Sequence, residues 1–245
     1  MSKLNYIDLF AGAGGLSEGF IREKFEPVAH VEMSAEASDT LKTRLAFHHF
    51  HHKNNLTKYY SYLKNNISRN ELWDAVPQYL LESVINEEIS DKTIEGIFQK
   101  IDLQLNERKV DVIIGGPPCQ AYSLVGRSRD PNRMKGDKRN FLFRYYAKFL
   151  IRYKPKFFVF ENVLGLLTAG NAKYLNEMLE LFSEIGYSAD FQVLNAEEYG
   201  VLQKRRRVII IGRKGKTKFH FPVLQKMENN WQIKRDLFFD LPYLK

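Results

Sequence analysis

The chain has 245 residues, of which 44% are hydrophobic, with a net charge of +8 and a single cysteine. This length and apolar fraction suffice for one sizeable hydrophobic core. A single cysteine excludes an internal disulfide, which fits a reducing compartment. No apolar run reaches the ~18 residues of a membrane-spanning helix, and Asp8 interrupts the short N-terminal apolar stretch, so we expect neither a signal peptide nor a membrane partner.

Apolar runs of strand length alternate with amphipathic stretches along most of the chain. Strands are predicted at residues 4–10, 27–32, 110–114, 157–161, 187–194 and 208–212. Helices are predicted between them at residues 16–24, 35–47, 141–153 and 172–185, the last one closed by Gly186. This alternation predicts an α/β fold with a doubly wound, mostly parallel sheet and ligands at the carboxyl ends of its strands.

Residues 48–100 interrupt this alternation. They contain no obvious buried strand, and their six Lys/Arg nearly balance seven Asp/Glu. Parts of the segment, such as residues 78–88 and 92–101, have a helical pattern. We therefore expect a helical insertion, of open role, that divides one α/β domain into residues 1–47 and 101–213, with residues 214–245 as a tail.

The positive charge is concentrated in two segments. Residues 122–156 hold eleven Lys/Arg against two acids, and residues 203–218 hold eight Lys/Arg and no acid. A basic field of this kind suits a polyanion such as nucleic acid. Charge alone does not separate this reading from a solvated basic face without a partner.

A glycine-rich loop follows the first predicted strand. Gly12, Gly14 and Gly15 allow a tight turn and a close approach of the backbone to a ligand. Glu32 ends the next strand, where a carboxylate can accept hydrogen bonds from both hydroxyls of a ribose. Together these residues favour an adenosine-type cofactor; the alternative is a glycine-rich connection beside a surface acid.

Cys119 lies in the string Gly115-Gly116-Pro117-Pro118-Cys119-Gln120, directly after an apolar run. A thiol in a loop at the end of a buried strand is typical of a nucleophile, and nearby positive charge would supply the reactive thiolate. The alternative is a buried structural cysteine. Pro117 and Pro118 oppose it, because they fix a loop rather than a packed strand.

An acid and a basic cluster are the remaining candidate site residues. Glu161 closes the apolar strand at residues 157–161, and its alternative role is to pair with a neighbouring arginine. The string Gln203-Lys204-Arg205-Arg206-Arg207 comes immediately before the last strand. Side chains alternate along an extended chain, so Arg205 and Arg207 share one face while Lys204 and Arg206 share the other.

In this order, the segments at residues 8–15, 115–120, 161–163 and 203–207 resemble the DNA (cytosine-5) methyltransferase family. The resemblance spans most of residues 6–213 and implies a Rossmann-like fold, S-adenosylmethionine as cofactor and DNA as partner. It implies that Cys119 attacks C6 of cytosine and Glu161 binds N3, while Arg205 and Arg207 contact O2 and hold Glu161. The cofactor-binding residues it implies are Asp8, Phe10, Ala11, Gly12, Gly14, Gly15, Glu32 (ribose), Met33 (adenine), Asp102 (adenine amino group), Pro118 and Leu142.

The resemblance also carries expectations about the rest of the protein. Residues 236–242 resemble the segment that leads into the family's target-recognition domain, so we expect a second polypeptide or a missing C-terminal region to supply recognition. Such enzymes in bacteria usually protect DNA from a partner endonuclease, which implies a restriction-modification role in the cytoplasm. Two alternatives stay open: a transfer RNA cytosine-5 methyltransferase, and an inactive cofactor-binding half that needs a second chain. No metal site is expected, because the histidines at 48, 51 and 52 have no acid or thiol close in sequence.

Overall fold

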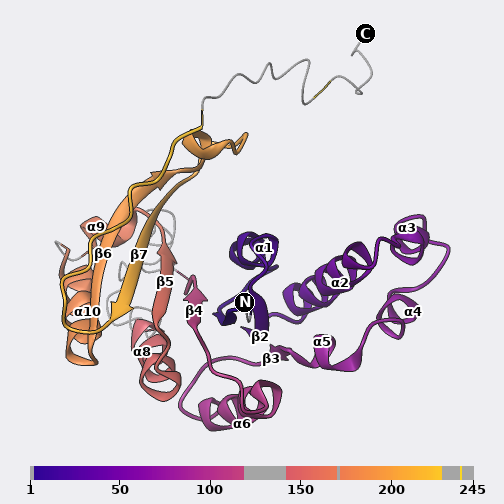
Figure 1. Cartoon of the computed structure of the whole chain (residues 1–245), viewed down its shortest axis with the longest axis horizontal. Coiled ribbons are helices and arrows are strands. Elements are labelled where there is room, and N and C mark those ends of the chain that lie inside the picture. Colours follow the sequence, from indigo (N-terminus) through magenta and orange to yellow (C-terminus); the bar gives the residue numbers. More distant parts are fainter. Residues whose placement is uncertain (1–2, 119–141, 170–171, 228–237, 239–245) are drawn as a thin grey trace, which may run out of the picture.

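A computed structural model describes residues 3–118, 142–169, 172–227 and 238. Its centre is a seven-stranded sheet with the order β3-β2-β1-β4-β5-β7-β6 (Figure 1). The strands are β1 Asn5–Leu9, β2 Glu26–Glu32, β3 Val84–Asn86, β4 Val112–Gly115, β5 Phe157–Asn162, β6 Tyr187–Asn195 and β7 Arg206–Lys214. The helices are α1 Gly15–Arg22, α2 Ala35–His52, α3 Thr57–Leu63, α4 Arg69–Trp73, α5 Gln78–Glu82, α6 Ile94–Leu105, α8 Leu142–Tyr153, α9 Gly165–Thr168 and α10 Lys173–Glu184, with a 3₁₀ turn η2 at Ala196–Tyr199.

The expected α/β fold with a mostly parallel sheet is confirmed. The neighbours β3, β2, β1, β4 and β5 all pair in parallel. β7 runs the other way and pairs antiparallel with both β5 and β6. This reversal places the beginning of β7, rather than its end, at the edge where β5 ends.

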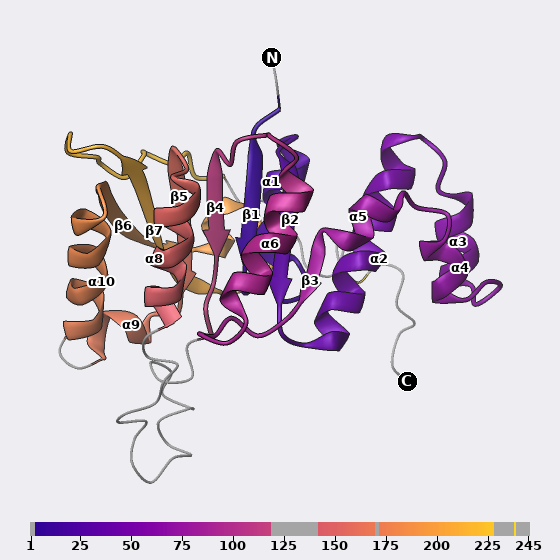
Figure 2. The ribbon, with the colours of Figure 1, turned by 90° about the horizontal axis from the view of Figure 1, so that it is seen from below.

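Helices cover both faces of the sheet. The larger apolar cluster lies on one face, where α6, α8 and α10 pack on the sheet through side chains such as Ile97, Tyr146 and Phe182 (Figures 1 and 2). On the other face, Tyr6, Val112 and Ile114 pack against α1. The strands alternate accordingly: in β5, Phe158 and Phe160 belong to the larger cluster, while Val159 packs with the α1 side. Glu161 therefore falls on the α1 face.

The expectation that residues 48–100 hold no strand is wrong. β3 lies within them and pairs in parallel with β2, so that Val31 lies opposite Ile85. α6 then crosses from β3 to β4, which makes both elements part of the sheet domain. β3 has only 3 residues, too short a run for a period-2 pattern to show.

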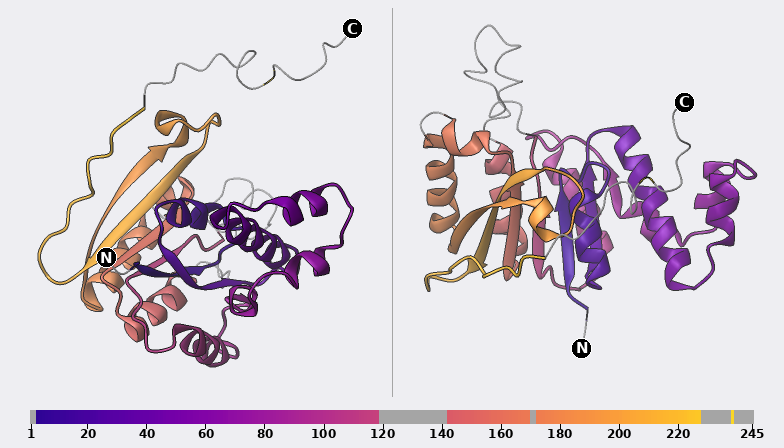
Figure 3. Two further views of the ribbon diagram at one scale, coloured as in Figure 1. Left: turned by 45° about the vertical axis from the view of Figure 1, so that its right-hand side comes forward. Right: turned by 90° about the horizontal axis from the view of Figure 1, so that it is seen from above.

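The segment after β7 returns alongside β6 (Figure 3, left). The backbone N–H of Phe219 donates to Ser188 Oγ over 2.9 Å, and that of Phe221 donates to Asp190 Oδ2 over 2.9 Å. The outermost strand of the sheet is thus covered by residues of the tail. Among the described helices, none is both long and apolar enough to span a membrane.

Candidate active site

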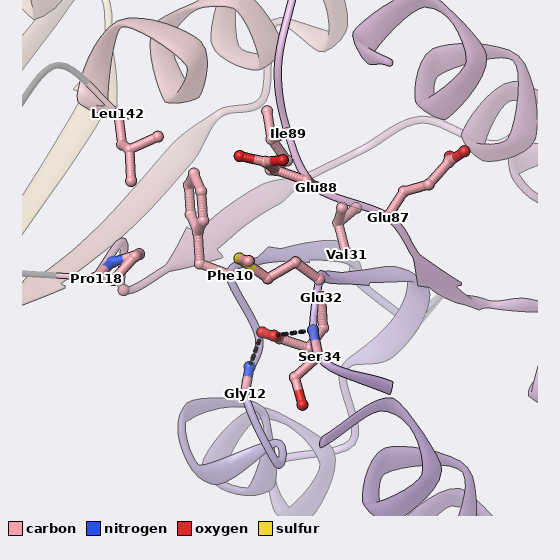
Figure 4. A pocket seen from close by; sticks show the side chains of 12 residues that line it. Phe10, Gly12, Val31, Glu32, Ser34, Glu87, Glu88, Ile89, Pro118 and Leu142 are labelled. Carbon is pink, nitrogen blue, oxygen red and sulfur yellow. Dashed lines mark hydrogen bonds between the residues drawn. The ribbon is translucent and has the colours of Figure 1, made fainter. Parts of the chain in front are cut away.

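A cavity of about 490 Å³ opens at the carboxyl ends of β1, β2 and β4 (Figure 4). This is the edge at which a parallel α/β sheet binds its ligands. The lining residues are Phe10, Gly12, Val31, Glu32, Met33, Ser34, Glu87, Glu88, Ile89, Gly116, Pro118 and Leu142.

Glu32 ties together two of the loops that border this cavity. Its Oε2 accepts a hydrogen bond from the backbone N–H of Gly12, and its Oε1 accepts one from that of Ser34, each at 2.8 Å (Figure 4). The glycine-rich loop is built for this turn, since Phe10 and Gly12 have φ of 57° and 55°. A carboxylate has about four lone-pair sites, so both oxygens of Glu32 can still accept hydroxyl groups of a ligand.

Six residues with an implied cofactor role line the cavity: Phe10, Gly12, Glu32, Met33, Pro118 and Leu142. Ala11, Gly14 and Gly15 do not. Ala11 packs in a cluster with Leu41, Leu45 and Val84. Gly14 precedes α1, and a Cβ on it would lie 2.8 Å from the Cδ2 atom of Leu41, so this glycine serves helix packing.

Asp8 lies inside the fold rather than in the cavity. Asp8 is only 1% exposed, and its Oδ2 atom lies 3.7 Å from Nδ1 of His30, which is also buried. Burial raises the pKa of the Asp8 carboxyl above its ordinary value, although the neighbouring His30 opposes this shift. Tyr6, two residues earlier on the same face of β1, hydrogen-bonds to Ser17 of α1.

Asp102, for which the resemblance implies an adenine contact, does not line the cavity. Asp102 lies on α6, where it pairs with Arg152 and accepts a hydrogen bond of 3.1 Å from Tyr153. The segment Glu87-Glu88-Ile89, directly after β3, lines the cavity instead. The sequence holds one signal for it: the apolar pair Val84-Ile85 comes shortly before an acid, Glu87, as the apolar residues Val28 and Ala29 come shortly before Glu32.

Glu161 lies next to this cavity at the end of β5. Its Oε1 is 2.7 Å from Nε of Arg207 and 3.6 Å from Nη2 of Arg205. Both arginines reach it because the antiparallel pairing sets Glu161 opposite Ile209, two residues beyond Arg207. Arg206 and Lys204 lie on the other face, where they line a separate hollow with Leu164 and Asn195.

The chain that leads to Cys119 passes directly beside Glu161. A Cβ on Gly116 would lie 2.8 Å from Oε2 of Glu161, so only a glycine fits there without moving the carboxylate. Asn162 holds the next turn, because its Nδ2 donates to the carbonyl of Pro117 over 3.4 Å. Sequence reasoning gave Asn162 no role, although it directly follows Glu161. Cys119 itself lies outside the described residues.

A sequence model of C-5 cytosine-specific DNA methylases matches residues 4–72 and 65–241. The chain belongs to this family. Among the family's members, the Type II methyltransferase M.Bpa9945I of Bacillus paralicheniformis is 39% identical over 98% of this chain and 61% of its own length. M1.HphI of Haemophilus parahaemolyticus is 33% identical over 93% of this chain and 50% of its own length. The chain thus spans about half to three fifths of the length of these curated relatives.

Solved structures share this fold. A protein described as a DNA modification methyltransferase, encoded within an E. coli prophage, has a TM-score of 0.57 and 27% identity over 86% of this chain and 47% of its own. The DNMT2 of Spodoptera frugiperda has a TM-score of 0.55 over 94% of this chain and 55% of its own, and its 18% identity shows the fold alone.

Proposed function

We propose that this chain contains the methyl-transfer centre of a DNA cytosine-5 methyltransferase. The observation that carries the proposal is the close approach of Gly116 to Glu161: three residues before Cys119, a Cβ on the chain would lie 2.8 Å from a carboxylate that Arg207 holds in place. We infer from this approach that the segment after Pro118 supplies its nucleophile at the same edge of the sheet as Glu161, beside the cavity.

The residues around the cavity fit S-adenosylmethionine. A volume of about 490 Å³ is in the usual range of ~300–1,000 Å³ for small-molecule sites. Phe10 and Ile89 offer apolar surface to an adenine, and Glu32 offers acceptors to a ribose. The carboxylate of Glu88 suits a positive charge of the cofactor, whereas that of Glu87 is already paired with Lys100 over 3.0 Å. When bound, this cofactor supplies an activated methyl group.

The residues of the chain would act on the base as follows. C5 of cytosine is a weak nucleophile, and addition of the Cys119 thiolate to C6 breaks the aromaticity and makes C5 enamine-like. The electrons move towards N3, where Glu161 donates a proton or a hydrogen bond. After C5 has gained the methyl group, a base such as water takes the C5 proton, the thiolate leaves C6 as the C5–C6 double bond re-forms, and N3 returns its proton to Glu161. The target must leave the duplex first, because its C6 face is stacked there.

The setting in the cell is part of the same proposal. The relatives are named Type II methyltransferases, and we propose a restriction-modification role in the bacterial cytoplasm for this chain. Its catalytic domain comprises residues 1–47 and 101–213 together with β3 and α6, while the lobe from the end of α2 to α5 is inserted into it.

A tritium-transfer assay with labelled S-adenosylmethionine tests the proposal. Mixed duplex DNA and transfer RNA are compared as acceptors, with the chain alone and with the product of the adjacent gene, and the labelled base is identified by chromatography. We expect 5-methylcytosine in DNA, absent with Cys119→Ser. Label in RNA alone, or on another base, would overturn the proposal.

A further inference from the structure

The helices α3 and α4 form a lobe beyond α2, at the end of the molecule opposite to α10 (Figures 1 and 2). This lobe has an apolar cluster of its own, in which Phe50, Leu72 and Val76 are buried and Tyr59 and Tyr62 pack against them. The lobe is therefore a packed unit rather than a loose loop. None of the residues in the proposed methyl-transfer centre lies in it.

Charge is segregated within the inserted segment, although its total is almost balanced. Residues 53–70 hold four cations, Lys53, Lys58, Lys64 and Arg69, and no acid. Residues 71–95 hold seven acids and one lysine. The near neutrality of the whole segment thus hides a basic half, which coincides with α3 and the turn that follows it.

The exposed side of α3 combines lysines, an aromatic ring and amides. Tyr60 is 52% and Leu63 is 55% exposed; Tyr60 lies one helical turn before Lys64, and Leu63 directly precedes it. We call Lys58, Tyr60, Leu63, Lys64, Asn65 and Asn66 the α3 surface. Arg69 is already engaged, since it pairs with Asp39 at 2.8 Å and lies over the Trp73 ring. Within the described part of the chain, neither Lys58 nor Lys64 has a carboxylate within 4 Å, although the charge of Lys58 helps to lower the pKa of Glu71; both lysines are exposed.

The end of this surface is tied to the edge of the sheet that holds the cavity. α2 starts directly after the cavity residues Met33 and Ser34, and its early residue Asp39 pairs with Arg69. Ser68 caps α4 with a capping box to Glu71, which fixes the turn that follows Lys64. The α3 surface is thereby anchored on the same side as the proposed centre rather than at the amino ends of the strands.

We propose that the α3 surface contacts the phosphate backbone of the duplex to one side of the target cytosine. This inference rests on the proposed function, which makes DNA the substrate. Lysines neutralise phosphates, amides of asparagine and the hydroxyl of tyrosine donate to phosphate oxygens, and none of these contacts reads a base. The surface therefore lengthens the bound stretch of DNA without adding sequence preference.

The test is DNA binding by the chain with Lys58→Gln and Lys64→Gln combined. Each phosphate contact contributes about 0.9 to the slope of log affinity against log salt, so the slope should fall by about 1.8. At ~0.1 M salt the affinity for a duplex of about 30 base pairs should fall by an order of magnitude or more. Because both side chains are exposed, the melting temperature should not change.

A matched control removes two exposed lysines at the amino ends of the strands, by Lys109→Gln and Lys156→Gln. Lys109 precedes β4, and Lys156 pairs with Asp111 just before β5. This variant loses the same charge but should keep the slope of the unmodified chain within about 0.5. An equal loss in both variants would overturn the inference, because net charge rather than the α3 surface would then explain it.

Failure of the inference and failure of the proposed function give different results. If the unmodified chain binds and methylates DNA but the α3 variant keeps its slope, the α3 surface serves another partner, such as an acidic protein, and the inference is wrong. If the unmodified chain binds no DNA, the proposed function is wrong. If both hold, the variant with Lys58→Gln and Lys64→Gln should have a higher KM for DNA and an unchanged kcat, since the α3 surface touches no reacting atom.

Discussion

The Nε atom of Arg207 lies 2.7 Å from Oε1 of Glu161, which joins the beginning of β7 to the end of β5. Arg205 is farther from the same oxygen, at 3.6 Å, and its side chain is 49% exposed against 26% for Arg207. Arg207 is therefore the residue that orients Glu161, and Arg205 keeps more freedom to meet a ligand.

Replacing Arg207 by alanine should lower methyl transfer by about 100-fold or more, the usual cost of losing one preorganised donor at a reacting centre. The carboxylate of Glu161 would lose its nearest partner and its fixed direction. Single-turnover rates at saturating DNA and cofactor measure the loss. Arg207→Lys should recover part of the rate by restoring the charge; no recovery at all would argue against orientation of Glu161 by a cation.

Gly116 and Gly115 should differ sharply when each is changed to alanine. At Gly116 the new methyl group meets the Glu161 carboxylate at 2.8 Å, so the acid must move and methyl transfer should fall, while the fold survives. At Gly115 the methyl group meets the carbonyl oxygen of Leu9 at 2.5 Å, which lies in the rigid sheet. Gly115→Ala should therefore destabilise the protein by several kcal/mol, roughly as overpacked cores do. Thermal melting and transfer rates of both variants distinguish these effects, and equal melting temperatures would contradict them.

Cys119→Ser should abolish methyl transfer and leave cofactor affinity nearly intact. Serine keeps the shape but is far less ionised at neutral pH. A duplex that contains 5-fluorocytosine should trap the unmodified chain covalently, because the fluorine cannot leave as a proton. The trapped complex is visible on a denaturing gel, and its persistence in the serine variant would exclude Cys119 as the nucleophile.

Glu32→Ala should weaken S-adenosylmethionine binding well over tenfold. The lost ribose contacts are charge-assisted hydrogen bonds, each worth roughly 1.5–3 kcal/mol. The variant also frees the N–H groups of Gly12 and Ser34, which Glu32 binds at 2.8 Å each. Glu32→Gln keeps the shape of the side chain, so its cofactor affinity should lie between those of the unmodified chain and Glu32→Ala. Calorimetric titration of the cofactor gives the affinities, and an unchanged value in Glu32→Ala would place the cofactor elsewhere.

Glu18→Gln should lower stability at neutral pH. Burial alone would raise the pKa of Glu18, but hydrogen bonds from His48 and Arg22 and the charges of His48 and Arg44 outweigh it and lower the pKa to about 2. A carboxylate with a depressed pKa stabilises the fold above its unfolded pKa of ~4.3 and loses this contribution as pH falls towards 2. Urea denaturation of both proteins should therefore show a difference at pH 7 that shrinks below about pH 4.5. A difference that grows in acid would contradict the ion-pair account.

The sequence predicts the loops at the carboxyl ends of the strands well, because the residue types within each loop indicate its role. The glycines after β1 and the acid at the end of β2 are readable as a ligand site, and Phe10, Gly12, Glu32 and Met33 do line the cavity. Glu161 and its two arginines are brought together as the family resemblance implies, and the arginines share a face as alternation along an extended chain predicts.

What the sequence hides depends on tertiary context. β3 is too short to show a strand pattern in the sequence, so the sequence does not point to Glu88 and Ile89 as cavity residues. The adenine contact was expected from Asp102 instead. The direction of β7 is set by which neighbours it joins, and no local pattern encodes that. Asp8 belongs to the α1 face of β1 with Tyr6, a consequence of strand alternation that proximity to the glycine loop obscures.

The register in which β5 pairs with β7 also decides which basic side chains face Glu161. Glu161 is opposite Ile209, and side chains on a strand repeat every two residues. One inserted residue between Arg207 and Val208 would turn every side chain of the basic string to the opposite face of the strand. Arg206 would then take the place of Arg205 near Glu161, and Arg205 and Arg207 would point towards the hollow behind the sheet. Two inserted residues would restore the face but shift both arginines by about 7 Å. The length of chain between Arg207 and its first paired residue, Val208, thus fixes which arginines face Glu161 in this protein.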